Sequence, residues 1–337
     1  MKIEKGLISV IMSNYNTPET FLRESIQSIL NQTYTNFEFI IVDDASTDDS
    51  LAIIESYSDQ RIKIIKNTEN LGLTRSLNKA LDECNGEYVA RMDSDDVSLP
   101  ERFRKQVDFL RNNDATVCGT WVEFFGISDV LNSEKTLCKI LPEKNIFRIY
   151  QLFGNSPNIV HPSAMFNRTK LIEKGIRYDE KFRYSQDYKM WVSCANSGTC
   201  AIVPEILLKY RVSTSNISFL KKDQQLECVY GIIQEQLDLL HLKLTDEIKP
   251  LHLLLLTTRK QYDPKIREWI KSLIAANKKH RVYDQKSFSN LLWKKWAETT
   301  YFALRKSKSI KRIKLLMMLP IRYWNELLVI RKSRRYN

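Results

Sequence analysis

The chain has 337 residues, of which 43% are hydrophobic and 27% are charged. This composition excludes a disordered chain, and the length suffices for one large domain or two smaller ones. The residues before Leu7 lack the apolar run of a signal peptide. No apolar stretch reaches the roughly eighteen residues that would predict a membrane-spanning helix.

The basic charge is concentrated in the last 34 residues. Residues 304–337 contain eleven Lys and Arg residues and one acid, which gives +10 of the net +12 of the whole chain and leaves +2 for residues 1–303. Apolar residues such as Trp324 interleave with the basic ones, a pattern typical of segments that bind anionic membrane surfaces. A solvated helical face or a basic oligomer contact is the alternative interpretation.

The six cysteines are scattered, without a C-x-x-C pair and without a histidine at ligand spacing. This argues against a zinc site and indicates the reduced thiols of a cytosolic protein. The cysteines are Cys84, Cys118, Cys138, Cys194, Cys200 and Cys228.

The first part of the chain alternates predicted strands and helices. Apolar, β-branched runs predict strands, and apolar residues at helical spacing predict helices. The strands are expected at residues 7–12, 37–42, 62–65 and 88–92, and the helices after Glu19 and at 48–57, 73–81 and 101–111. Because such alternation is typical of a parallel sheet covered by helices on both faces, the sequence predicts an α/β fold.

Polar and acidic residues follow these strands, at the edge of the sheet where ligands bind. Burying the three acids after the fourth strand unpaired would be costly, so one interpretation is a hard divalent cation held by oxygen ligands. A solvated acidic loop before a helix is the other. There is no G-x-G-x-x-G after the first strand and no P-loop motif, so the usual glycine loops would not hold a nucleotide. The residues are Asn14, Tyr15, Asn16, Asp43, Asp44, Asp93, Asp95 and Asp96.

The pattern is less regular from residue 116 onward. Strands are expected at 116–125, 161–166 and 203–212, and helices at 146–153 and from Gln186 onward. Asp187 would lie in the first turn of the latter helix, where the helix dipole accommodates an acid. Residues 221–300 look helical, so we predict one domain over residues 1–215 and a helical region over residues 216–337.

Several of these pieces, in this order, resemble a family 2 glycosyltransferase with a GT-A fold. The resemblance covers roughly residues 6–215 and not residues 216–337. A single D-x-D motif would be weak support, because it occurs by chance in many proteins. The pieces are residues 9–16 (SVIMSNYN), 28–34 (SILNQTY), 41–46 (IVDDAS), 70–78 (NLGLTRSLN), 90–96 (ARMDSDD), 161–163 (HPS) and 186–187 (QD).

The resemblance implies a donor site. In such enzymes Asn14, Tyr15 and Asp44 would line the pocket for the nucleoside, with Arg75 nearby. Asp93 would face the ribose and the metal, and Asp95 would coordinate Mg²⁺ or Mn²⁺. The donor would be a nucleotide-sugar, and UDP is the usual nucleotide of the family.

The resemblance also implies an acceptor site. Asp187 matches the catalytic base, although Gln186 stands where the family usually has Glu. His161 is either near the acceptor or a packed, hydrogen-bonded histidine. Arg211 either contacts phosphate or pairs with an acid.

The implied activity is an inverting, metal-dependent transfer of one sugar. The acceptor would be a lipid-linked glycan, as in bacterial O-antigen or capsule assembly, with the basic tail on the inner face of the cell membrane.

A nucleotidyltransferase is one alternative, although it would need a glycine- and basic-rich loop after the first strand. A non-catalytic sugar- or membrane-binding protein is another, although it would not need both Asp95 and Asp187. A nucleic-acid partner is not expected, because the tail has no reading motif and the sheet edge is acidic.

Overall fold

The structure is a computed structural model, and it describes residues 3–126, 137–138, 146–153, 159–212, 222–256 and 263–306. The chain divides into two compact units, Met1–Phe147 with Pro157–Cys228 and Arg148–Ser156 with Val229–Asn337. The predicted boundary at residue 215 and residues 307–337 of the predicted basic tail lie outside the described residues. No helix in the described ranges is long and apolar enough to cross a membrane.

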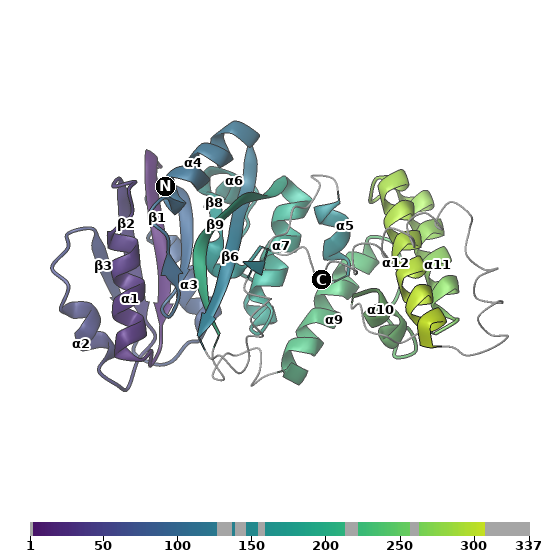
Figure 1. Cartoon of the computed structure of the whole chain (residues 1–337), viewed down its shortest axis with the longest axis horizontal. Helices are drawn as coiled ribbons and strands as arrows, with labels where there is room; N and C mark the ends of the chain where they lie inside the picture. The colour runs from purple at the N-terminus through teal and green to yellow at the C-terminus, as the bar shows by residue number, and fades with distance from the viewer. Residues whose placement is uncertain are drawn as a thin grey trace. The chain divides into compact units, whose positions relative to one another are not determined.

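The first unit is built on one sheet of nine strands, with helices on both faces (Figure 1). The strand order is β3-β2-β1-β4-β8-β6-β9-β5, and β7 pairs with β6. The strands are β1 (Glu4–Asn14), β2 (Phe37–Asp43), β3 (Ile62–Lys66), β4 (Gly86–Asp93), β5 (Val97–Ser98), β6 (Ala115–Gly126), β7 (Leu137–Cys138), β8 (Met165–Asn167) and β9 (Thr199–Val212).

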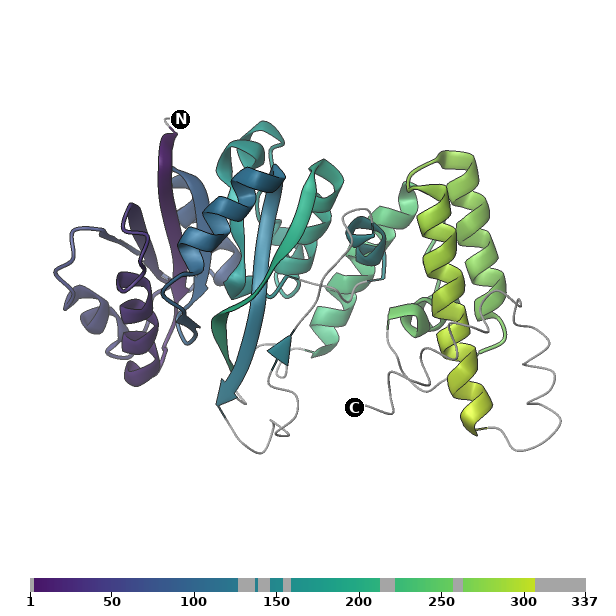
Figure 2. The same ribbon diagram turned by 45° about the horizontal axis from the view of Figure 1, so that its top comes forward.

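The first four strands of the predicted alternation, β1 to β4, pair in parallel as expected. The short strand β8 then enters antiparallel between β4 and β6, and the long strands β6 and β9 run parallel beside each other (Figure 2). The sheet is therefore mixed, with parallel pairing over its longest strands.

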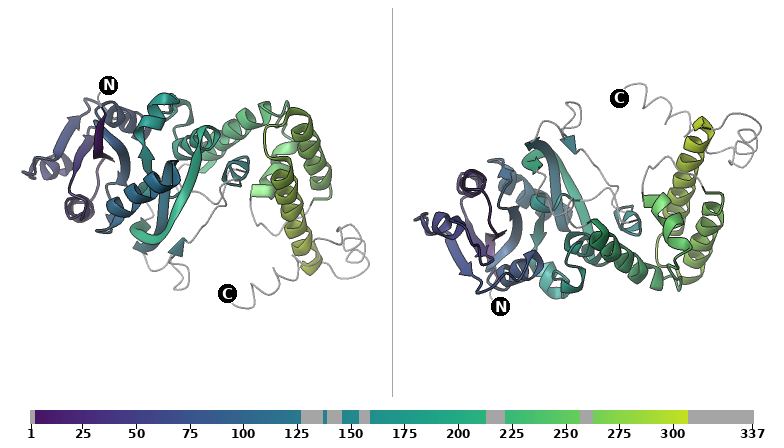
Figure 3. Two further views of the ribbon diagram at one scale, coloured as in Figure 1. Left: turned by 90° about the horizontal axis from the view of Figure 1, so that it is seen from above. Right: turned by 90° about the horizontal axis from the view of Figure 1, so that it is seen from below.

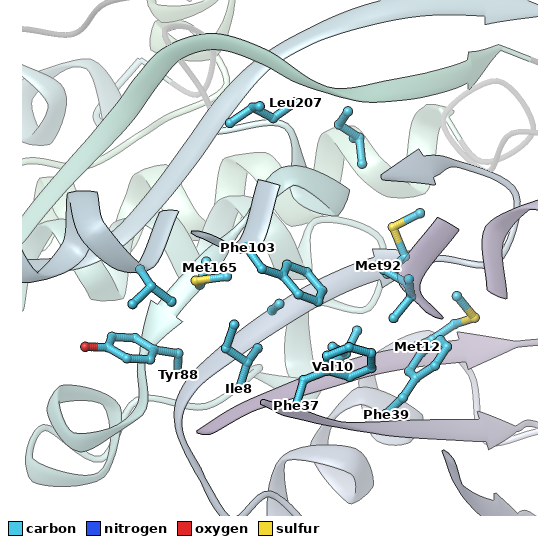
Figure 4. Close-up of a cluster of buried hydrophobic side chains, with 14 of the residues drawn as sticks. Ile8, Val10, Met12, Phe37, Phe39, Tyr88, Met92, Phe103, Met165 and Leu207 are labelled. Atoms are coloured by element: carbon cyan, nitrogen blue, oxygen red, sulfur yellow. The ribbon is translucent and has the colours of Figure 1, made fainter. Parts of the chain in front are cut away.

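Two hydrophobic cores cover the two faces of this sheet. Alternate residues of each strand point to opposite faces, so Val10 and Met12 of β1 join one core, while Ile11 joins the other. Figure 4 shows the first core, where Phe103 packs beside the strands. Helices α1 (Glu19–Leu30), α2 (Ser50–Glu55) and α4 (Arg102–Asn113) cover this face, and α3 (Leu73–Asp82), α6 (Arg168–Glu173) and α7 (Gln186–Ser197) cover the other.

The prediction of a strand at residues 161–166 is wrong for the first half of that range. His161–Ser163 forms a 3₁₀ turn, η1, and strand β8 begins only at Met165. Pro162 explains the difference, because proline lacks a backbone N–H and cannot complete a sheet ladder.

The second unit is helical. It contains α10 (Ile248–Leu256), α11 (Ile266–His280) and α12 (Gln285–Lys306), while α5 (Phe147–Gln151) and α9 (Lys222–Asp238) span the division between the units. Helices α11 and α12 lie side by side (Figure 3). The buried His252 accepts a hydrogen bond from Trp269 Nε1 at 3.2 Å, and its Nε2 lies 2.8 Å from the carbonyl oxygen of Leu152. Through this contact Leu152 joins the second unit, although it precedes the predicted boundary.

Candidate active site

The carboxyl ends of β1, β2 and β4 bring the predicted polar residues together. Asn14 is in register with Asp43, and Ser13 is in register with Asp93. The sequence predicted this meeting because parallel neighbours end at the same edge of a sheet. The edge therefore carries amide and carboxylate groups from three strands.

Asp43 and Asp44 hold two loops at this edge. Asp43 Oδ1 accepts hydrogen bonds from Asn14 Nδ2 at 3.0 Å and from Ser46 Oγ at 2.6 Å. Asp44, also buried, accepts from Asn67 Nδ2 at 2.7 Å and from the backbone N–H groups of Leu71 and Gly72 at 2.9 and 2.8 Å. The pair therefore organises the chain around the predicted nucleoside pocket.

Two side chains that are predicted to line that pocket have groups that could bind a ligand. Asn14 Oδ1 is buried and has no hydrogen-bond partner among the described residues. Tyr15 is 48% exposed, which is unusual for a large aromatic ring and leaves its face open to a ligand. Arg75 lies farther out, where it is half exposed and forms an ion pair with Glu180 at 2.8 Å.

Three carboxylates gather just after β4. One oxygen from each of Asp93, Asp95 and Asp96 lies within 4.8 Å of the others. Burial and the charge of Asp93 raise the pKa of Asp95 to about 6, and burial together with both neighbouring acids raises the pKa of Asp96 well above its usual value. Both shifts arise first from burial and then from repulsion between the acids, and a nearby cation would favour their ionised forms.

This cluster fits a hard divalent cation. Carboxylate oxygens are the ligands that Mg²⁺ and Mn²⁺ prefer, and Asp96 Oδ2 is buried without a hydrogen-bond partner in the described part of the chain. The family resemblance implies ligand roles only for Asp93 and Asp95. Asp96 was visible in the same acidic run, but only its position in the fold shows that it joins the cluster.

Arg211 closes the cluster from strand β9. Its backbone N–H donates to Asp96 Oδ1 at 2.7 Å, its Nε donates to the carbonyl oxygen of Asp95 at 2.7 Å, and its Nη2 pairs with Glu24. The guanidinium also lies 3.9 Å from the ring centre of Phe21 and 4.3 Å from that of Phe125. In this structure Arg211 therefore pairs with an acid, and its predicted contact with phosphate stays a prediction.

His161 is buried and hydrogen-bonded. Its Nε2 lies 2.8 Å from the hydroxyl of Tyr178, and its ring packs edge-on against Trp191. Burial and the positive charge of Arg91 hold the pKa of His161 well below its usual value, so the ring is neutral. These are the properties of a packed histidine, and a contact with the acceptor stays a prediction.

Asp187 lies in the first turn of α7, as expected. Its Oδ1 accepts a hydrogen bond from the N–H of Tyr188 at 2.8 Å. Burial raises the pKa of Asp187, and the charge of Asp93 adds to the rise while Arg91 opposes it. Helix α7 covers the face of the sheet toward which Arg91 and Asp93 point, and the role of Asp187 as the base stays a prediction.

Comparison with known proteins identifies the class. The model of the family described as "Glycosyl transferase family 2" matches residues 9–175. An uncharacterized glycosyltransferase of Methanocaldococcus jannaschii is 40% identical over 231 residues, which cover 66% of this chain and 77% of that protein. The O-antigen biosynthesis glycosyltransferase WbnJ of Escherichia coli is 35% identical, over 61% of this chain and 80% of its own length. The UDP-Glc:alpha-D-GlcNAc-diphosphoundecaprenol beta-1,3-glucosyltransferase WfgD of Escherichia coli is 28% identical, over 63% of this chain and 79% of its own length.

The fold agrees with this class. The crystal structure of S. aureus TarS 1-349 in complex with UDP-GlcNAc superposes with a TM-score of 0.56 at 20% identity, covering 89% of this chain and 88% of that one. The protein is thus a glycosyltransferase with a GT-A type fold. Within that class, the chain belongs to family 2, as the sequence resemblance predicted.

Proposed function

We propose that this glycosyltransferase moves one sugar, with inversion, from a nucleotide-sugar to a hydroxyl of a lipid-linked glycan. The observation that carries the proposal is the acidic cluster after β4, at the edge of the sheet where the first strands end. Two similar proteins support the substrate classes, since WfgD is named for a UDP-glucose donor and a diphosphoundecaprenol acceptor, and TarS was crystallised with UDP-GlcNAc. A UDP-sugar is accordingly the proposed donor.

The donor would lie along the sheet edge. Asn14 Oδ1, which has no hydrogen-bond partner among the described residues, would accept a hydrogen bond from the nucleoside base, and the exposed ring of Tyr15 would pack against that base. Asp44 would act by holding the loop that ends at Gly72, since its oxygens are already engaged there.

Asp93 and Asp95 would hold Mn²⁺ or Mg²⁺, with Asp96 beside them. A divalent cation bound there would neutralise the diphosphate and the charge that develops on the leaving nucleotide.

Asp187 would act as general base. The acceptor oxygen forms a bond to the anomeric carbon while the bond from that carbon to the diphosphate breaks on the opposite face. The bonding pair leaves with the nucleoside diphosphate, and the hydroxyl proton passes to the Asp187 carboxylate. A single displacement of this kind inverts the anomeric configuration.

The basic C-terminal segment would determine where the enzyme works in the cell. The basic residues 304–337 would hold the enzyme on the anionic inner face of the cell membrane, where a lipid-linked acceptor lies. Deleting residues 304–337 should abolish sedimentation with anionic vesicles and leave donor hydrolysis intact. If the truncated protein still sediments with these vesicles, the tail is not the anchor.

The first test is a panel of sugar nucleotides, with Mn²⁺ or with a chelator, scored for release of free nucleoside diphosphate. We expect slow, metal-dependent hydrolysis of one donor and its loss in Asp95→Ala. If no donor is hydrolysed, the measurement would be repeated with a lipid-linked acceptor. NMR of the product would then report the anomeric configuration. If no sugar nucleotide binds in the presence of metal, the proposed donor and metal roles are wrong.

A further inference from the structure

Arg91 is a buried cation beneath the acidic cluster. It lies on β4, two residues before Asp93, so the two side chains point to the same face of the sheet. Only 2% of Arg91 is exposed, and its Nη2 pairs with Asp93 Oδ1. Its Nε and Nη1 are also buried, and neither has a hydrogen-bond partner within the described residues.

Arg102, the first residue of α4, provides a comparison. It is equally buried but lies with Met92 on the opposite face of β4, and all three of its guanidinium nitrogens have partners. Nε donates to Gln106 Oε1 at 3.0 Å, Nη2 donates to the carbonyl oxygens of Arg91 and Ala164 at 2.8 and 3.2 Å, and Nη1 lies 3.6 Å from Met92 Sδ. Arg102 is therefore satisfied by neutral groups, as a purely structural arginine would be.

The guanidinium of Arg91 has hydrogen-bond partners for only some of its nitrogens within the described residues, and this requires another explanation. A buried cation is costly unless opposite charges and hydrogen bonds compensate it. The opposite charges around Arg91 are those of the site, since Asp93 is its direct partner and one oxygen each of Asp95 and Asp96 lies within 4.8 Å of an Asp93 oxygen. Its position thus balances carboxylates that would otherwise repel one another.

We propose that Arg91 is a positioning residue that orients Asp93 before the substrates bind and weakens the binding of a divalent cation that arrives alone. This inference rests on the proposed metal site. The guanidinium already occupies one Asp93 oxygen, and its positive charge lies close to any cation that the three aspartates hold. The negative charge of a nucleoside diphosphate would offset that repulsion, so the metal and the donor would bind together.

The test is Mn²⁺ binding to the full chain without nucleotide, measured by electron paramagnetic resonance of the free ion. Neutral variants, Arg91→Met and Arg91→Gln, should bind Mn²⁺ at least about tenfold more tightly than wild type, because a close positive charge is removed. Their kcat for donor turnover should nevertheless fall, because the charged guanidinium no longer orients Asp93. Arg91→Gln keeps an amide donor for Asp93 and serves if Arg91→Met does not fold.

Two controls separate this role from a structural one. Arg91→Lys keeps the charge and should keep Mn²⁺ affinity within about threefold of wild type, with a lower kcat because the planar fork is lost. Arg102→Met removes an equally buried charge from the other face and should also leave Mn²⁺ affinity within about threefold. Adding UDP should narrow the difference in Mn²⁺ affinity between wild type and the neutral variants.

The outcomes are distinguishable. If wild type binds Mn²⁺ but both neutral variants bind it equally or more weakly, Arg91 does not oppose the metal and the inference is wrong. The same holds if Arg102→Met tightens binding as much as they do. If wild type binds no Mn²⁺ and hydrolyses donors equally well with chelator, the metal part of the proposed function fails and this inference fails with it.

Discussion

Replacing Arg211 by methionine tests whether this residue holds the site together or binds phosphate. Methionine preserves apolar contact with Phe21 and Phe125 but removes the hydrogen bond to the Asp95 carbonyl and the pair with Glu24. A hydrogen bond that involves a charged group contributes about 1.5–3 kcal/mol. The pair with Glu24, whose side chain is half exposed, adds at most about 1 kcal/mol.

The expected loss of unfolding free energy for Arg211→Met is therefore about 2–4 kcal/mol. In a domain of this size each kcal/mol lowers Tm by about 2–4 °C, so Tm should fall by roughly 5–15 °C in differential scanning calorimetry. Glu24→Gln is the matched control, because it removes only the ion pair and should cost no more than about 1 kcal/mol.

Donor kinetics well below the new Tm complete the experiment. If Arg211 acts by holding β9 against the Asp95 turn, the donor KM should change by less than about threefold while Tm falls. An unchanged Tm with a donor KM raised tenfold or more would refute this reasoning and assign Arg211 to the diphosphate.

Three further predictions concern the base, the buried histidine and a loop glycine. Asp187→Asn should lower kcat by about 10²–10⁴-fold. In wild type the rate should fall as pH falls through the raised pKa of Asp187, because the protonated acid cannot accept a proton. A pH–rate profile that shows no such fall would contradict the base assignment. His161→Phe should cost about 1–3 kcal/mol in urea unfolding, because the buried Tyr178 hydroxyl loses its partner; loss of kcat at unchanged stability would instead indicate an acceptor contact. Gly72→Ala should lower the free energy of unfolding by about 1–2 kcal/mol, because residue 72 has φ +85° and a Cβ would lie 2.9 Å from Arg183 Nη2. An unchanged free energy of unfolding would show that the loop adjusts to alanine without cost.

Local patterns were sufficient for the first part of the fold. The alternation of apolar β-branched runs with amphipathic segments predicted β1 to β4 and the helices between them, because each signal lies within one segment of chain. The meeting of Asn14, Asp43 and Asp93 followed from the same pattern, since parallel strands end at one edge. The order of the motifs predicted the family.

Contacts between residues far apart in the sequence could not be predicted from local patterns. Strand β8 enters the sheet between β4 and β6 because of pairings with residues far away in sequence, and no local signal encodes them. Arg211 acquires its partners from Glu24 and Asp95 in the same way, more than a hundred residues away.

Arg91 shows the contrast within a single strand. In the sequence it is one charged residue in an apolar run, and it drew no prediction. Only the fold, which buries it between the core and the acidic cluster, shows that its charge faces the carboxylates of the site. The amino-acid sequence is sufficient to predict which chemical groups this protein brings to the edge of its sheet. The tertiary structure decided which of them balance one another, because electrostatic interactions depend on distance and burial rather than on position along the chain.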